Sequence, residues 1–356
     1  MPDYSANEIE AIGSRLLDFY LKTEVKDNVT YDKPTMKKMV AKRKSFGATK
    51  GKISAPVRLA HGNAGTNDGL KGIGPGDQLD FYNPSNERRA EVERRKMHMG
   101  IQVTEDQLED AGIRVTDNRR QPSGGGTDVH PVLINTLTSI YADLNEQWDE
   151  KFNTLLWGDG TSDPKALAGI RSIILDDPTQ GTVCGLSGAL NTAWRNRAYT
   201  TAHAASGGTG AITSNVANGG ELIQVLQKDN RQLMRFKSKI DMRPCGSDFM
   251  DALEREMRAN GQYFQTGAGG GDVEVKTLNL GGIEFYYDPE LDNIGRAKYS
   301  YAFDSRDICL YVRDGMWKQE RTPSRPYDRF VFHHSVVTTC NLLTDKRNGS
   351  AVYQIT

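Results

Sequence analysis

Three glycine-rich stretches are the first candidates for chemistry, because glycine-rich turns let backbone N–H groups approach a phosphate or an oxyanion. The segment 47–52, GATKGK, has three residues between its first two glycines where a phosphate loop has four, and Ile53 replaces the magnesium-binding Ser or Thr. The segment 72–77, GIGPGD, lacks the third glycine of a dinucleotide-binding turn. The segment 185–189, GLSGA, ends in Ala189 where a nucleophile elbow ends in glycine. None of the three stretches therefore completes a nucleotide site or a hydrolase site.

A group of carboxylates is the next candidate, because paired carboxylates can hold a divalent metal ion. A helix-bundle metal site also needs a histidine three residues after a glutamate. Asp149 stands at that position after Glu146, so the metal interpretation fails. We instead expect an acidic stripe that faces solvent or another subunit, formed by Asp143, Glu146, Asp149 and Glu150.

Histidines and cysteines supply no further ligand set. His333 and His334 are neighbours on a predicted strand, so their side chains point to opposite faces, and no third ligand is evident. The cysteines lie far apart and none forms a CxxC pair, so we predict buried free thiols in a reducing compartment. No catalytic residue, cofactor or metal is predicted, which favours a structural role. The four cysteines are Cys184, Cys245, Cys309 and Cys340.

The charge of the chain is nearly balanced overall but uneven along its length. The formal net charge is −1, which argues against a dedicated nucleic-acid binder. Residues 29–60, however, carry nine cations against one carboxylate, Asp32. Such a block is typical of a solvated face or an interaction arm, and in a near-neutral protein we expect its partner to be another copy of the chain. The nine cations are Lys33, Lys37, Lys38, Lys42, Arg43, Lys44, Lys50, Lys52 and Arg58.

Length and composition indicate a soluble globular protein. The chain has 356 residues, enough for about two domains. Hydrophobic residues make up 37% and charged residues 26% of the sequence. No run approaches the roughly 20 apolar residues needed to span a bilayer, and the first residues do not form a signal peptide. We therefore expect an aqueous, cytoplasmic setting and no membrane partner.

The pattern in the first third of the chain predicts an arm followed by a long loop that extends away from the main body. Apolar residues at helical spacing over 9–20 predict a short amphipathic helix. A strand is expected at 53–59, a polar glycine-rich loop at 61–86 and a returning strand at 97–103. An irregular connection of this length is uncommon inside a compact domain, so it indicates contact with other molecules.

One long helix is expected at 131–157. Thr127 or Asp128 can cap it, Pro131 suits its first turn, and glycines and a proline in 158–164 end it. At 1.5 Å per residue it would be about 40 Å long. Its apolar face is formed by Ile134, Leu137, Tyr141, Leu144, Trp148, Phe152 and Leu155.

The remaining residues mix helices and strands without a regular βαβ rhythm, so the predicted class is α+β. We expect strands at 167–175 and 240–245, helices at 221–236 and 248–260, a surface loop at 204–220, and several strands from 273 to the end.

This order of elements resembles the Hong Kong 97-type capsid fold. Three stretches, 31–69, 155–174 and 192–199, are similar to those of major capsid proteins from tailed double-stranded DNA bacteriophages. The resemblance implies four parts, with these expected boundaries: an N-terminal arm (1–45), an extended loop or E-loop (46–112), a peripheral or P domain (113–185 and 313–339) with a spine helix at about 130–157, and an axial or A domain (186–312 and 340–356).

The resemblance also implies a function. Such a protein self-assembles into pentamers and hexamers that form the icosahedral head around the phage double-stranded DNA, and it is not an enzyme. We expect it in the virion capsid, assembled in the host bacterial cytoplasm. Because the predicted arm begins almost at once, a separate scaffolding protein is expected, together with a portal. A decoration protein is a further candidate partner, and packaged DNA would be contacted non-specifically.

The residues expected at contacts between subunits are the basic Lys37, Lys38, Lys42, Arg43, Lys44 and Lys71, and the acidic Asp143, Glu146, Asp149 and Glu150. Some relatives join subunits through lysine–asparagine crosslinks, and Lys71 lies suitably in the loop, but no glutamate or asparagine partner can be recognised. Two alternatives stay open: the shell of an encapsulin-like nanocompartment, which shares this fold, and a soluble hydrolase with an unrecognised site.

Overall fold

The computed structural model describes residues 30–47, 51–60, 72–78, 86–104, 131–216, 220–235, 237–260, 277–280, 283–324 and 331–356. The chain divides into two units, Met1–Tyr31 and Asp32–Thr356, and the described helices and strands all lie in the second unit.

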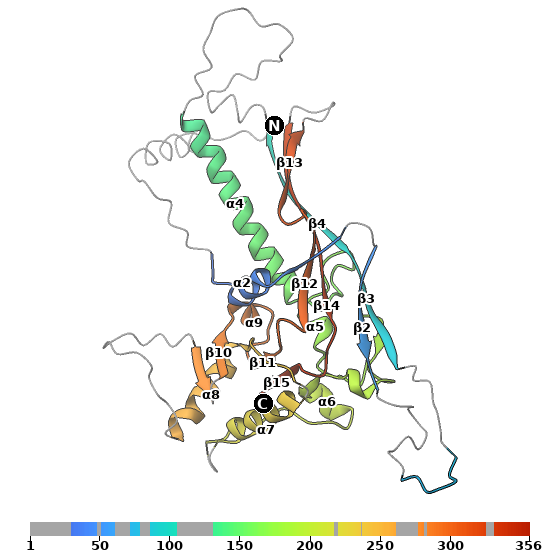
Figure 1. The fold of residues 1–356 in the computed structure, drawn as a ribbon. Helices are drawn as coiled ribbons and strands as arrows, with labels where there is room; N and C mark the ends of the chain where they lie inside the picture. Colours follow the sequence, from blue (N-terminus) through green and yellow to red (C-terminus); the bar gives the residue numbers. More distant parts are fainter. Residues whose placement is uncertain are drawn as a thin grey trace, which may run out of the picture. The chain divides into compact units, whose positions relative to one another are not determined.

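Helices and strands interleave along the second unit (Figure 1). The helices are α2 (Pro34–Ala41), α4 (Pro131–Leu156), α5 (Ile170–Ile173), η1 (Thr192–Trp194), α6 (Thr201–Ala205), α7 (Glu221–Arg235), α8 (Ser247–Ala259) and α9 (Pro289–Asn293). The first strands are β1 (Lys44–Phe46), β2 (Lys52–Arg58), β3 (Glu87–Glu93), β4 (Arg95–Thr104), β5 (Thr182–Val183), β6 (Leu186–Ser187), β7 (Arg197–Tyr199) and β8 (Pro244–Cys245). The later strands are β9 (Thr277–Leu280), β10 (Ile283–Tyr287), β11 (Tyr299–Ala302), β12 (Ile308–Arg313), β13 (Gln319–Ser324), β14 (Val331–Thr344) and β15 (Ala351–Gln354).

The long strand β14 is the centre of a five-stranded sheet. One edge of β14 pairs with β4, from Val331 opposite Thr104 to Cys340 opposite Arg95. Its other edge pairs with β12 and then with β13, and β1 adds in parallel to the far side of β12. A strand near the beginning of the described chain therefore completes a sheet whose centre lies near the end.

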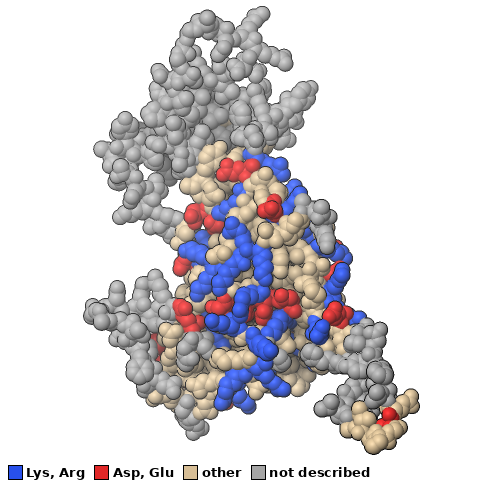
Figure 2. Space-filling view, viewed as in Figure 1, with Lys and Arg blue, Asp and Glu red and all other residues tan. Residues whose placement is uncertain are grey.

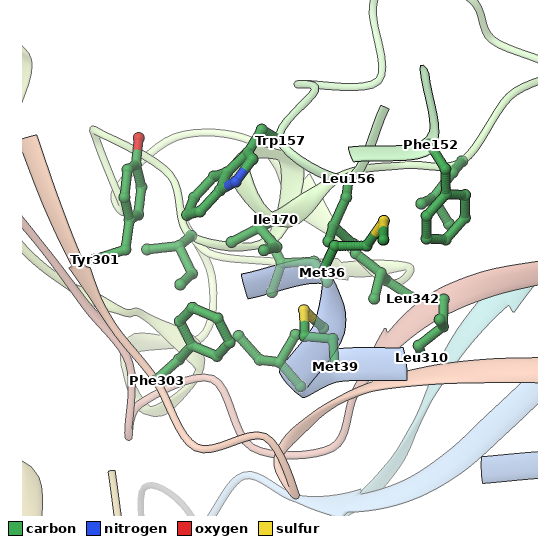
Figure 3. Close-up of a cluster of buried hydrophobic side chains, with 14 of the residues drawn as sticks. Met36, Met39, Phe152, Leu156, Trp157, Ile170, Tyr301, Phe303, Leu310 and Leu342 are labelled. Atoms are coloured by element: carbon green, nitrogen blue, oxygen red, sulfur yellow. The ribbon is translucent and has the colours of Figure 1, made fainter. Parts of the chain in front are cut away.

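Side chains on the two faces of β14 join different cores, because successive residues of a strand point to opposite faces. Even-numbered residues such as Val336 and Leu342 belong to the largest core, which also contains Leu144 and Trp148 of α4. Figure 3 shows Leu342 among other side chains of this core. The odd-numbered Leu343 packs instead with residues of the antiparallel β2–β3 pair. The sheet is thus a layer between α4 and the β2–β3 pair.

The six-stranded sheet has the order β7-β15-β11-β8-β10-β9 and its own core. Helices α7 and α8 pack on it through amphipathic faces, with Leu226 and Leu253 buried against strand residues such as Phe285 and Tyr353. Helices form here because apolar residues recur at three- and four-residue steps in both segments.

Most predicted elements are confirmed. The long helix is α4, its Leu144, Trp148 and Phe152 are buried, and it ends at Leu156, just before the glycine-rich segment. Helices α7 and α8 and the strands β9 to β12, β14 and β15 also lie where the sequence predicts them, whereas β13 was not predicted. The cysteines are free; three are buried and Cys184 is partly buried.

Two predictions are wrong or incomplete. The segment 167–175 contains the one-turn helix α5 and no strand. A run this short does not distinguish a helical turn from a strand by its apolar spacing. The strand that returns after the loop and pairs with β2 is β3. The segment predicted as the returning strand forms β4, which belongs to the five-stranded sheet. The helix predicted at 9–20 and the caps Thr127 and Asp128 lie outside the described residues.

The predicted domain boundaries stay predictions. Three of them fall within strands of the five-stranded sheet: the boundary after 45 lies within β1, the boundary after 312 within β12, and the boundary after 339 within β14.

Candidate functional site

Residues 32–46, the basic segment, carry five of the predicted contact residues and are built into the fold by the helix α2. Pro34 starts the helix, at the position where its missing N–H costs no hydrogen bond. Met36 and Met39 then lie on one face and are 7% and 2% exposed. Figure 3 shows both methionines among the side chains of the largest core, beside Leu156 and Leu310. The helix is therefore anchored by burial along one face.

A buried polar contact fixes the start of α2. The hydroxyl of Thr35 donates a hydrogen bond to Oδ2 of Asp288 and lies 3.2 Å from the hydroxyl of Tyr286. Asp288 also accepts from Trp157 Nε1 at 3.3 Å and from the backbone N–H of Glu290 at 3.1 Å. Burial raises the pKa of Asp288 to about 6, although these three hydrogen bonds favour the ionised form. One carboxyl group thus joins α2, the residue after α4 and the first turn of α9.

The other face of α2 is charged, and its lysines contact groups of the same chain. Lys37 pairs with Asp32 at 2.6 Å, and Lys42 forms an ion pair with Asp241. The ammonium of Lys38 lies 3.7 Å from the ring centroid of Tyr286. Figure 2 shows this pattern on one face of the molecule, where Lys and Arg side chains form a band with carboxylates among them.

The end of the basic segment lies along β12. Arg43 donates a hydrogen bond to the carbonyl of Val40 at 3.1 Å, and its guanidinium lies 5.2 Å from the ring centroid of Trp317. Lys44 donates to the carbonyl of Arg306 at 3.4 Å and begins β1, which runs parallel to β12. The cations of this part therefore lie over aromatic rings and backbone carbonyls.

Two of the four predicted acidic residues on α4 also have partners in the same chain. Glu146 lies 3.7 Å from the ammonium of Lys33, whose side chain is only 5% exposed. Asp149 pairs with Lys318 at 2.9 Å. Asp143 is exposed and Glu150 is half-buried, and neither makes an ion pair with another of the described residues.

These contacts show that carboxylates of the same chain supply counter-charge to the basic residues. A neighbouring subunit and packaged DNA are further candidate sources of negative charge. Five of the nine cations of residues 29–60 lie within ion-pair distance of a carboxylate of the same chain: Lys33, Lys37, Lys42, Lys52 and Arg58. Lys50, one of the nine, and Lys71 lie outside the described residues.

Three residues of this site were missed: Asp241, Asp288 and Trp157. The partners of Asp241 and Trp157 lie far away in the chain, so local spacing gives no signal for these two residues. Asp288 did have a local signal, because an aspartate directly before a proline is typical of a helix N-cap, and Asp288 caps α9.

Among the described residues, no group of three or more His, Cys, Asp or Glu side chains is arranged to hold a metal ion. Within the same part of the chain, no helix is both long enough and apolar enough to cross a membrane.

No protein-family model matches the sequence, and no curated sequence matches it. Solved structures do. The chain is similar to a subunit of the cyanophage A-1(L) capsid, with a TM-score of 0.65 and 12% identity over 93% of this chain and 94% of that one. The chain has the Hong Kong 97-type capsid fold. A subunit of the native GTA particle capsid shares it, with a TM-score of 0.54 and 10% identity over 94% of both chains. A subunit of the mature capsid of bacteriophage PhiM1 also shares it, with a TM-score of 0.53 and 9% identity over 94% of this chain and 90% of that one.

The capsid fold accounts for the mixture of helices and sheets in this chain. Its likeness to the cyanophage subunit covers 93% of the chain, so it extends well beyond any single sheet or helix. At these identities the likeness is one of fold and does not extend to the roles of individual side chains.

Proposed function

We propose that this chain is the major capsid protein of a tailed double-stranded DNA phage, and that it self-assembles into pentamers and hexamers of an icosahedral head. The observation that carries the proposal is the likeness in fold to capsid subunits over almost the full length of both chains. The protein acts as a building block and not as an enzyme. It resides in the virion after assembly in the host cytoplasm, with a separate scaffolding protein and a portal as partners.

We assign the parts of the fold accordingly. The basic segment lies at the junction of the N-terminal arm (1–45) and the E-loop (46–112), and the E-loop contains the β2–β3 pair. The helix α4 is the spine helix of the P domain (113–185 and 313–339). Helices α7 and α8 and all six strands of the six-stranded sheet lie in the A domain (186–312 and 340–356). Packaged DNA and a decoration protein would be secondary partners.

Within this proposal, contacts between subunits use the charged groups that the chain leaves unpaired among its described residues. Asp143 and Glu150 on α4 are such carboxylates. Lys38, Arg43 and Lys44 are cations whose contacts are aromatic rings and carbonyls, so they can still attract a carboxylate of a neighbour. Each exposed pair contributes only about 0–1 kcal/mol, but the pair is repeated at every copy of the interface.

The experiment is direct imaging of the expressed full chain, alone and with its scaffolding protein. Closed shells in negative stain and a fast boundary in sedimentation velocity are expected. A chain that stays monomeric at high concentration with scaffold supplied would contradict the proposal. Purified particles that contain a protein cargo and no DNA, isolated from infected cells, would favour a nanocompartment instead.

The charged contacts need a second experiment, because reversing Lys42 also breaks its pair with Asp241. Asp143→Lys with Glu150→Lys changes two groups that have no ion pair among the described residues, and it should block or slow assembly. The control is Lys42→Gln with Asp241→Asn, which removes both charges of a pair within the chain, keeps an oxygen that can accept from Ser305, and should assemble normally. Equal assembly of both variants would show that α4 carboxylates are not at an interface.

A further inference from the structure

Arg243 is a buried cation that the described residues do not neutralise. Its side chain is 1% exposed, and its one hydrogen bond among the described residues is from Nη2 to the amide oxygen of Asn230, at 2.9 Å. The buried Nε has no partner among those residues, and none of their carboxylates lies within ion-pair distance. A guanidinium has five N–H donors, so most of this group's capacity is unused.

A second buried arginine shows that the fold can satisfy such a group where the role is structural. Arg347 is also fully buried, but its three nitrogens donate to the carbonyls of Ile173 and Trp194 and to the amide oxygen of Asn196, at 2.6–3.2 Å. A buried charge without such partners is costly, because it loses its hydration. Arg243 is therefore short of an acceptor, and that acceptor has to be an anion if the charge is to be balanced.

Arg243 also lines a cavity of about 280 Å³. The cavity is walled by Leu226 and Phe285, and its rim carries the exposed Gln227 and Arg231 of α7. The guanidinium carbon lies 5.1 Å from the ring centroid of Phe285. A ring in that place supports the guanidinium while its N–H groups remain able to bind in their own plane.

The nearby carboxylate on the same helix is already committed. Asp229, one residue before Asn230, accepts from Tyr353 at 2.6 Å and from Tyr199 at 3.1 Å, and it forms an ion pair with Arg197. It is fully buried on the side of α7 that faces these partners. The cavity therefore combines two arginines with two side-chain amides, and none of the described residues that line it is acidic.

We propose that this cavity is an oxyanion-binding site that takes a carboxylate or a phosphate, with Arg243 as its buried ligand and Arg231 at its rim. The volume suits a small anion or one carboxylate side chain and is below the usual range of about 300–1,000 Å³ for larger ligands. The ligand is either a free anion or a carboxylate of a second copy of the chain. Both present negatively charged oxygens that accept hydrogen bonds from a guanidinium.

The test is titration of the purified, unassembled full chain with sodium phosphate and with sodium glutamate, at constant ionic strength, by calorimetry and by thermal unfolding. Saturable binding of at least one of the two is expected. Arg231→Gln should weaken it about three- to tenfold, because a rim charge is lost. Lys228→Gln makes the same charge change on an exposed residue of α7 outside the cavity and should leave the affinity within about twofold.

A variant that supplies the anion from within the protein is the sharpest test. Asn230→Asp keeps the acceptor that Arg243 uses and adds a negative charge to it. The variant should unfold at a higher temperature than the natural chain when no phosphate is present, and its affinity for phosphate should be at least about tenfold weaker, equivalent to about 1.4 kcal/mol. Gln232→Glu adds the same charge on a residue of α7 that does not line the cavity, and it should do neither.

The outcomes separate cleanly. The site would be overturned if the natural chain bound neither phosphate nor glutamate, or if all four variants bound them with equal affinity. Binding of phosphate to the free chain but not to assembled shells would identify a carboxylate of a second copy as the occupant, and binding to both would identify a free anion. If the chain does not assemble at all, the proposed shell function fails, but the titration of the free chain still decides the anion site.

Discussion

The hydroxyl of Thr35 donates a hydrogen bond to the carboxylate of Asp288, although the two residues are 253 positions apart in the sequence. The contact is buried and connects the first turn of α2 to the first turn of α9. The basic segment is therefore held by a titratable group of the core as well as by its two buried methionines.

The stability of the protein should depend on pH through Asp288. Burial raises the pKa of Asp288 in the folded state to about 6, above the 3.8 of an exposed aspartate. Between these values the folded state binds more protons than the unfolded state, so this group's stabilising contribution is complete below about pH 4 and is lost as the pH rises towards 6. The free energy of unfolding should fall by about 2–3 kcal/mol across this window from this group alone.

Urea titrations of the natural chain and of Asp288→Asn at intervals from pH 4 to pH 8 measure the effect. Other carboxylates contribute equally to both proteins, so the difference between the two free energies isolates Asp288. The natural chain should lose stability relative to the variant as the pH rises. A difference that is constant with pH would mean that Asp288 titrates at its ordinary value.

Leu144→Asp should destabilise the protein by several kcal/mol, because Leu144 is 1% exposed in the largest core and a charge there loses its hydration. The matched control is Gln147→Asp, which places the same charge on an exposed residue of α4. Thermal unfolding followed by circular dichroism compares the two. A soluble Leu144→Asp protein with an unchanged melting temperature would mean that this face of α4 is not buried.

Glu256→Gln should loosen the start of α7 by about 1–3 kcal/mol, because a buried acceptor is lost and charged hydrogen bonds become neutral. Oε1 of Glu256 accepts from Asn215 N at 2.9 Å and Leu222 N at 3.3 Å, and Oε2 accepts from Ile223 N at 3.1 Å. Hydrogen exchange of these amides should accelerate in the variant. Asp251→Asn, on an exposed residue of the same helix α8, should leave their exchange unchanged.

Gly169→Ala should cost about 1–3 kcal/mol or more, because a Cβ at this position has no room. It would overlap the carbonyl oxygen of Gly158 and lie 2.6 Å from that of Leu155, and both are backbone atoms that cannot move aside. Gly47→Ala is the control, since a Cβ there meets nothing within 4 Å. Equal melting temperatures for the two variants would contradict the close approach of the two segments after α4.

The sequence predicts those elements whose pattern is long and regular. The helix α4 repeats its apolar residues over several turns, and α7 and α8 do the same over shorter spans, so periodicity alone locates them. The strand β14 is equally clear from its β-branched residues. The segment around Ile170 shows the limit, because a helix of one turn is too short for the spacing of its apolar residues to reveal a period.

Pairing between distant segments could not be predicted in the same way. Nothing near Lys42 in the sequence indicates Asp241, and nothing near Lys33 indicates Glu146, since each partner is brought close only by the folded chain. For the same reason the sequence showed the uneven charge of the basic segment but not where its counter-charge lies. Arg243 could not be predicted either, because its distinguishing property is that no carboxylate of the described residues lies within ion-pair distance of it in the folded chain.

The parallel pairing of β1 with β12 has a consequence for how the chain is made. Lys44 contacts the backbone of Arg306, 262 positions later. A ribosome adds about 5–20 residues per second, so about 13–50 s separate the synthesis of β1 from that of its partner. During this time Met36 and Met39 lack Tyr301, Phe303, Leu310 and Leu342, which complete the core around them. We therefore expect nascent chains to expose this methionine-bearing, lysine-rich stretch until translation is almost finished, long enough for a chaperone to bind it on the ribosome.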